Sequence, residues 1–367
     1  MTVSEDVVAP GVQAPADGWE LAPAAGPYFS WRYGETEGRL LDLYSRGKQR
    51  QWDAGVRIEW DQPHREDNPV GLPVAGVPLA GTEIWDELSE SQRQSLIVEH
   101  SSWQFSQFLH GEQGALICAA RIVETVPTID AKYYASTQVI DEARHVEAFS
   151  RFIDLRLPRQ YAIDDPLQDL LRASLQDSRW DLPYLGMQVL IEGLALGTFG
   201  LLRDSVRDPL ARELLAYVIQ DEARHVAFGR IALQQIYADI SDAERDDRVE
   251  FILTGCRLLR DRFVGAPVWE VVGLDTDRCL RAVTEAPAMR RFVNSVFTRI
   301  TPALASISLL TPRMKQGLMD LGIMPLGAPN LDRLLERDDH VAQRIERLRR
   351  REVDDLVARE ENPEESC

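Results

Sequence analysis

The six residues DEARHV at positions 141–146 occur again, unchanged, at positions 221–226. A glutamate precedes each copy at the same distance: Glu112 stands as far before Glu142, in the first copy, as Glu192 stands before Glu222, in the second. Three positions therefore repeat with one constant offset: a glutamate, a second glutamate, and a histidine one helical turn after it. We infer two copies of one structural unit.

Proline positions and capping signals place the repeated residues on long helices. Ser89 and Gln92 have the spacing of a capping box, and no proline follows before Pro127. Prolines then occupy first-turn or terminating positions further along the chain. The expected helices cover about 40–52, 90–125, 128–157, 165–178, 183–208, 209–239 and 242–264. No stretch has the pattern of a strand, so the sequence predicts an all-α protein.

The turns between these helices bring the repeated side chains to one level. Glutamate and histidine at i and i+3 share one face of a helix. Pro127 lies midway between Glu112 and Glu142, so in an antiparallel hairpin both carboxylates lie roughly 22 Å from the turn, at ~1.5 Å per residue. The midpoint of the second pair is residue 207, beside the turn expected at Pro209. Two such hairpins, packed face to face, gather four glutamates and two histidines inside a four-helix bundle.

This set of side chains is typical of a site for two divalent cations. Four buried carboxylates raise one another's pKa and cannot all stay ionised without compensation, whereas two divalent cations balance their charge. An oxygen-rich set with one imidazole per metal suits iron, or manganese, better than zinc. Two glutamates with two Glu-x-x-His motifs on four helices match di-iron and di-manganese carboxylate sites. The predicted ligands are Glu112, Glu142, His145, Glu192, Glu222 and His225.

Over about residues 90–240 the paired motifs resemble those of the ferritin-like di-iron carboxylate superfamily. It includes bacterial monooxygenase hydroxylases, soluble acyl-carrier desaturases, ribonucleotide reductase small subunits and bacterial N-oxygenases. The resemblance implies a ferritin-like four-helix bundle with extra N- and C-terminal helices. It also implies an enzyme that uses two irons and O2 to N-oxygenate or hydroxylate a small metabolite in a biosynthetic pathway. Manganese is the alternative metal.

The same resemblance implies a set of supporting residues. The aspartate before each motif glutamate is expected to accept a hydrogen bond from the metal-bound histidine of the other half, which fixes the tautomer of that histidine. The motif arginines are expected to hold these aspartates. The supporting residues are thus Asp141, Asp221, Arg144 and Arg224.

Three positions depart from particular members of the superfamily. Phe149 stands where reductase subunits carry a radical-bearing tyrosine, so a tyrosyl radical at that position is not expected. Leu196 stands where aromatic monooxygenase hydroxylases usually carry a threonine. Val218 stands where the best-known N-oxygenases carry a third histidine, which weakens that analogy.

A substrate pocket is expected beside the metals, one helical turn from the ligands on the first and third long helices. Its predicted lining residues are Phe108, Ala115, Leu116, Gln188, Ala195, Leu196 and Phe199.

Composition limits the partners. The formal net charge of −18 argues against a non-specific nucleic-acid binder and against adhesion to an anionic membrane. No GxGxxG fingerprint is present, so electrons are expected from a separate ferredoxin or flavin reductase. The N-terminus lacks the pattern of a signal peptide, which predicts a cytoplasmic protein. A homodimer is expected from the relatives.

The chain divides into three predicted regions. Residues 1–82 form a partly irregular extension with one helix, residues 83–264 the metal-binding bundle, and residues 265–367 a helical extension with a loose acidic tail. Three other functions stay open at this point: an acyl desaturase, a ferroxidase or iron-storage protein, and a non-catalytic helical module stabilised by metal.

Overall fold

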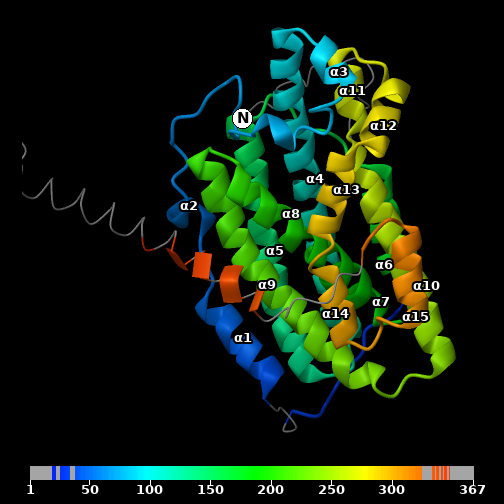
Figure 1. Cartoon of the computed structure of the whole chain (residues 1–367). Helices are drawn as coiled ribbons and strands as arrows, with labels where there is room; N and C mark the ends of the chain where they lie inside the picture. Colours follow the sequence, from blue (N-terminus) through cyan, green and yellow to red (C-terminus); the bar gives the residue numbers. More distant parts are fainter. Residues whose placement is uncertain are drawn as a thin grey trace, which may run out of the picture.

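The computed structural model describes residues 19–21, 25–33, 38–324, 333, 334, 336–338, 340, 341, 343, 344 and 347. All regular secondary structure in these residues is helical, which confirms the predicted all-α class (Figure 1). The acidic tail that the sequence predicts to be loose lies outside the described residues.

Four long helical runs form the bundle that the resemblance implied. They are α4 (Glu90–Thr125), α5 (Ile129–Arg156), the run from α7 (Leu182–Tyr184) through η2 (Leu185–Ile191) to α8 (Glu192–Ser205), and α9 (Pro209–Tyr237). Helix α4 packs along α5, and α8 packs along α9, so each repeated unit is a hairpin.

The sequence signals at the helix ends are present in the structure. The Ser89 side chain accepts a hydrogen bond from the Gln92 backbone N–H, and Gln92 reaches back to Ser89, which completes the capping box of α4. The Asp208 side chain accepts a hydrogen bond from Ala211 N, and Pro209 occupies the first turn of α9. These caps satisfy backbone donors that a helix N-terminus leaves without a partner.

The third helical run is less regular than the sequence predicted. Residues Leu185–Ile191 form a π-helix directly before Glu192. Such π-helical turns are rare in proteins, and those that occur often lie at functional sites. By length and composition the span Leu182–Ser205 could cross a membrane, but 89% of its most apolar window is buried in the fold. The run is therefore a core helix of the bundle.

The remaining helices surround the bundle. Helix α1 (Arg39–Gln49) packs against α5 and α9 (Figure 1). Helix α13 (Pro287–Val296) packs against α8, and α14 (Ile300–Ser306) packs against α8 and α9. The predicted fifth long helix ends at Asp261 rather than near 264, because a short 3₁₀ turn and then Gly265 at φ +70° end it. The other surrounding elements are α2 (Ala54–Arg57), η1 (Val74–Gly76), α3 (Glu83–Glu87), α6 (Asp165–Leu175), α10 (Asp242–Asp261), η3 (Arg262–Val264), α11 (Ala266–Val272), α12 (Thr276–Glu285), α13 (Pro287–Val296), α14 (Ile300–Ser306) and α15 (Pro312–Asp320).

Candidate metal centre

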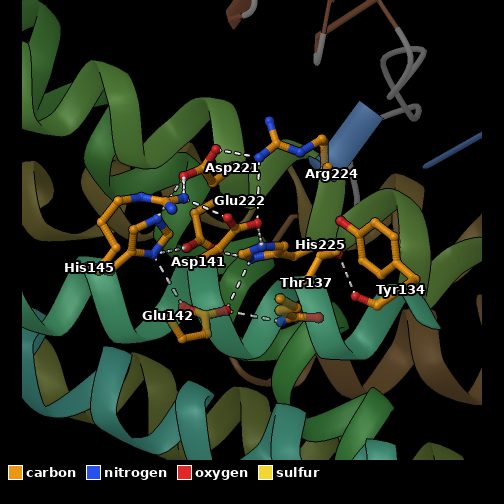
Figure 2. Close-up of polar contacts among 12 residues, drawn as sticks. Tyr134, Thr137, Asp141, Glu142, His145, Asp221, Glu222, Arg224 and His225 are labelled. Atoms are coloured by element: carbon orange, nitrogen blue, oxygen red, sulfur yellow. Dashed lines mark hydrogen bonds and ion pairs between the residues drawn. The ribbon is translucent and has the colours of Figure 1, made fainter. Parts of the chain in front are cut away.

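Six acidic and histidine side chains meet inside the bundle. Helix α4 contributes Glu112, α8 contributes Glu192, and each of α5 and α9 contributes the glutamate and histidine of its motif. None of the six is more than 5% exposed. The structure thus brings together all six side chains that the sequence predicted as ligands, and Figure 2 shows the four motif residues facing one another.

A first cluster forms around His145. Its members are Glu112, Glu142, His145 and Glu222, each offering one ligand atom within 4.8 Å of the others. His145 Nδ1 lies 3.2 Å from Glu112 Oε2, 3.2 Å from Glu142 Oε2 and 3.3 Å from Glu222 Oε1. The three carboxylates and the imidazole therefore face one small volume.

A second cluster forms around His225. Its members are Glu142, Glu192 and His225, again with ligand atoms within 4.8 Å of one another. His225 Nδ1 lies 3.1 Å from Glu142 Oε1 and 3.9 Å from Glu192 Oε1, and Glu222 Oε2 lies 3.6 Å from it. Glu142 and Glu222 therefore turn one oxygen toward each histidine, whereas Glu192 faces only His225.

The imidazoles are held from their outer side by the motif aspartates. His145 Nε2 lies 3.1 Å from Asp221 Oδ2, and His225 Nε2 lies 3.2 Å from Asp141 Oδ2. Each aspartate thus binds the histidine of the other hairpin. With Nε2 paired to a carboxylate, Nδ1 faces the glutamates, which is the arrangement of a metal-binding histidine.

Both arginines reach both aspartates. Arg144 Nη2 donates to Asp141 Oδ1 at 2.5 Å and to Asp221 Oδ2 at 2.8 Å. Arg224 Nη2 donates to Asp221 Oδ1, and lies 3.5 Å from Asp141 Oδ2 (Figure 2). These buried pairs connect the two hairpins behind the histidines.

Burial and neighbouring charges shift the pKa values of the side chains in the centre. Burial, with the nearby charge of Glu222, raises the pKa of Glu112 to about 8. Burial also raises the pKa of Glu192 well above its usual value. Burial opposes a charge on His145, but hydrogen bonds to Asp221 and the glutamates outweigh it and raise the pKa of that imidazole. Cations beside these carboxylates would keep them ionised.

Unpaired atoms indicate that cations fit the centre. Glu192 Oε2 is buried without a hydrogen-bond partner. Both oxygens of Glu222 and His225 Nδ1 are also buried without a hydrogen bond and have only the ion-pair contacts given above. Leaving such atoms unpaired costs about 1–3 kcal/mol each. Four carboxylates and two inward Nδ1 atoms form a donor set suited to two iron or manganese ions. The residues present therefore fit a two-metal centre.

Two residues outside the bundle also reach the aspartates, and the sequence analysis missed both. Trp52 Nε1 donates to Asp221 Oδ2 at 2.8 Å. Gln51 Nε2 donates to Asp141 Oδ1 at 2.7 Å, and Gln51 Oε1 accepts from Arg144 at 2.6 Å. They follow α1 and lie 90 and 169 residues from the aspartates they contact, so no local spacing pointed to them.

A buried amide was missed as well. Gln138 on α5 donates from Nε2 to Glu192 Oε1 at 2.6 Å and to Glu142 Oε1 at 3.0 Å. It lies one helical turn before Glu142, on the same helix face, so helical spacing could have indicated it.

A cavity opens beside the two clusters, and Glu112, Glu192 and Glu222 form part of its wall. Most of the other lining residues are apolar. Four predicted pocket residues line this cavity: Phe108, Ala115, Ala195 and Phe199. Lining residues that the sequence analysis missed include Trp103, Thr198 and Arg262.

Three predicted pocket residues do not line the cavity. Leu116 and Leu196 each directly follow a lining alanine, which turns them about 100° around the helix. Gln188 is fully buried in the π-helical segment, and its Nε2 lies 3.4 Å from Gln138 Oε1. The predicted register assumed regular helix there, and the π turn changes which side chains share a face.

The family described as P-aminobenzoate N-oxygenase AurF matches residues 34–308, well over half of the chain. No curated protein matches the chain. Among solved structures, an R2-like ligand-binding oxidase with an aerobically reconstituted metal cofactor aligns at 15% identity and a TM-score of 0.49, covering 75% of this chain and 95% of that chain. A variant of such an oxidase with a Mn/Fe cofactor aligns at 16% identity and 0.49, covering 75% and 96%.

Proposed function

Because the chain belongs to the P-aminobenzoate N-oxygenase AurF family and is a di-iron oxidoreductase, we propose that it transfers oxygen from O2 to the nitrogen of a small amine. N-hydroxylation places one oxygen atom in an N–H bond. The other oxygen atom leaves as water once two electrons and two protons have been supplied. The observation that carries this proposal is the cavity whose wall includes three of the buried glutamates.

The proposed ligand set divides into shared and separate carboxylates. Glu142 and Glu222 would help to hold both irons, because each turns one oxygen toward His145 and the other toward His225. Glu112 would be a further ligand of the metal beside His145, and Glu192 a further ligand of the metal beside His225. When bound, the irons would supply the site and the electrons for O2 activation.

The residues around the irons have separate tasks. Asp221 and Asp141 would keep each histidine in the tautomer with Nδ1 free for metal, and Arg144 and Arg224 would keep these aspartates ionised. Apolar side chains lining the cavity would exclude water from the reacting nitrogen.

The cavity favours an amine that also carries hydrogen-bond acceptors. Trp103 Nε1 and Thr198 Oγ1 belong to lining residues and are buried without a hydrogen-bond partner. Arg262 lines the same cavity and contacts Asp164 Oδ2 through Nε at 3.3 Å. We propose a substrate with a flat apolar body, an amino group for the irons, and a carboxylate for Arg262. p-Aminobenzoate has this chemistry.

The remaining expectations concern partners and location. Electrons would come from a separate ferredoxin or flavin reductase, and the chain would act as a homodimer in the cytoplasm. Each of these is a proposal that follows from the resemblance and from the absence of a dinucleotide fingerprint in the sequence.

The test uses a matched pair of substrates. The full chain is loaded with Fe²⁺ without oxygen, mixed with O2 and a chemical reductant, and given p-aminobenzoate or aniline, with products identified by mass spectrometry. Arg262→Leu should lower kcat/KM for p-aminobenzoate about 10- to 100-fold, the loss expected for a hydrogen bond to a charged group, and leave aniline unchanged. Oxygen found only on ring carbon, or oxidation of Fe²⁺ without any organic product, would reject N-oxygenation.

A further inference from the structure

The two copies of the internal repeat differ at a buried position directly beside the metal centre. Its constant offset, which carries Glu142 onto Glu222, pairs glutamate with glutamate, histidine with histidine, aspartate with aspartate and arginine with arginine. One helical turn before the motif glutamate, the same offset pairs Gln138 with Val218. Both side chains are fully buried. The two halves of the centre therefore differ in whether an amide lies against it.

Both amide hydrogens of Gln138 point to proposed ligands. Nε2 lies 2.6 Å from Glu192 Oε1 and 3.0 Å from Glu142 Oε1. Its Oε1 lies 3.4 Å from Gln188 Nε2, on the side away from the carboxylates. Only the NH2 group can donate, so two carboxylate neighbours fix which end of the amide faces the centre.

This contact makes the two oxygens of Glu192 different. Oε1 is held by Gln138, whereas Oε2 is buried without a hydrogen-bond partner. Oε1 also lies 3.9 Å from His225 Nδ1, so Gln138 orients the Glu192 carboxylate toward that histidine before a metal arrives. Glu112, the counterpart of Glu192 in the repeat, has no such amide among the described residues, and its hydrogen bond is to His145.

We infer that Gln138 is a positioning residue that makes the two metal positions unequal, with the position of Glu192 and His225 binding a divalent cation more tightly than that of Glu112 and His145. The inference rests on the proposed ligand set. Its physical reason is preorganisation: a buried carboxylate held by a donor loses less freedom on binding a metal than one that must still be oriented.

The experiment isolates each position and measures Co²⁺ binding without oxygen, by calorimetry and by the visible absorption of bound Co²⁺. Glu112→Gln leaves mainly the second position, and Glu192→Gln leaves mainly the first. With Glu112→Gln, adding Gln138→Met should weaken Co²⁺ binding about 10- to 100-fold and change its absorption. With Glu192→Gln, adding Gln138→Met should weaken binding much less, because Glu142 is then the one proposed ligand carboxylate that loses a contact with Gln138. Gln113→Met, an exposed change on α4, is the matched control.

The wild-type chain gives an independent measurement, should Gln138→Met fail to fold by circular dichroism. It should bind two Co²⁺ in steps of different affinity, with the tighter step kept in Glu112→Gln and lost in Glu192→Gln. The inference would be wrong if Gln138→Met lowered Co²⁺ affinity equally in both backgrounds, or in neither. It would also be wrong if the tighter binding step were kept in Glu192→Gln. A wild-type chain that binds no pair of cations would instead overturn the proposed function.

Discussion

Replacing Asp221 with asparagine tests the support behind His145. The Asp221 carboxylate is fully buried and faces four donors. Its Oδ2 accepts hydrogen bonds from Trp52 Nε1 at 2.8 Å, Arg144 Nη2 at 2.8 Å and His145 Nε2 at 3.1 Å. Its Oδ1 accepts a hydrogen bond from Arg224 Nη2. Burial would raise the pKa of Asp221, but the charge of Arg224 and the other partners holds that pKa well below its usual range. An anionic carboxylate is therefore the form that this site requires.

The expected effect of Asp221→Asn on stability follows from the donors that lose an anionic partner. Asparagine keeps one oxygen, so Oδ2 can still accept, but its NH2 group then faces the guanidinium of Arg224 and the negative charge is lost. Breaking a buried ion pair by changing one partner costs about 3–5 kcal/mol of unfolding free energy. Loss of a carboxylate behind a ligating histidine lowers metal affinity about 10- to 100-fold.

Two measurements check this prediction. Urea unfolding of the metal-free chain gives the stability change, and anaerobic Fe²⁺ titration gives the affinity. Asp239→Asn, an exposed change just after α9, is the matched control. If Asp221→Asn kept both wild-type stability and wild-type affinity, the reasoning about these aspartates would be wrong.

Three further changes test the cavity, the packing and the acid response. Ala195→Phe should fill the cavity and lower kcat/KM roughly 10- to 200-fold, with both metals retained by elemental analysis; unchanged kinetics would contradict the cavity as substrate site. Gly186→Ala would bring a Cβ within 1.9 Å of Ser174 Oγ, so urea unfolding should show a loss of about 1–3 kcal/mol. Burial lowers the pKa of His100 to about 4 from 6.5, so the unfolded chain takes up this proton first as the pH falls. The free energy of unfolding should therefore fall by about 2 kcal/mol at pH 5 and hardly change at pH 7. This fall should be absent in His100→Phe.

The repeat made the bundle predictable. A duplicated motif, proline positions and one capping box were enough to place α4, α5 and α9 within a few residues, because each signal acts within a helical turn or two. The meeting of six side chains followed from spacing alone, since equal distances from a turn put residues of an antiparallel hairpin at one level. Which glutamates face both histidines did not follow, because that depends on side-chain rotamers.

Contacts between distant segments could not be predicted in this way. Nothing near Trp52 in the sequence indicates that its indole donates to a carboxylate 169 residues away. The π turn before Glu192 also has no signal in the local sequence, and it displaced Gln188 from the expected pocket. Tertiary packing decided both features, and local periodicity carries no information about it.

The placement of Gln51 and Trp52 has a practical consequence for anyone who shortens the gene. A fragment that begins at residue 83 would keep every helix of the bundle and all six proposed ligands. It would nevertheless expose the backs of both aspartates to solvent, since the indole and the amide that cover them come from upstream. Trimming everything before that point would therefore cut into the metal site itself.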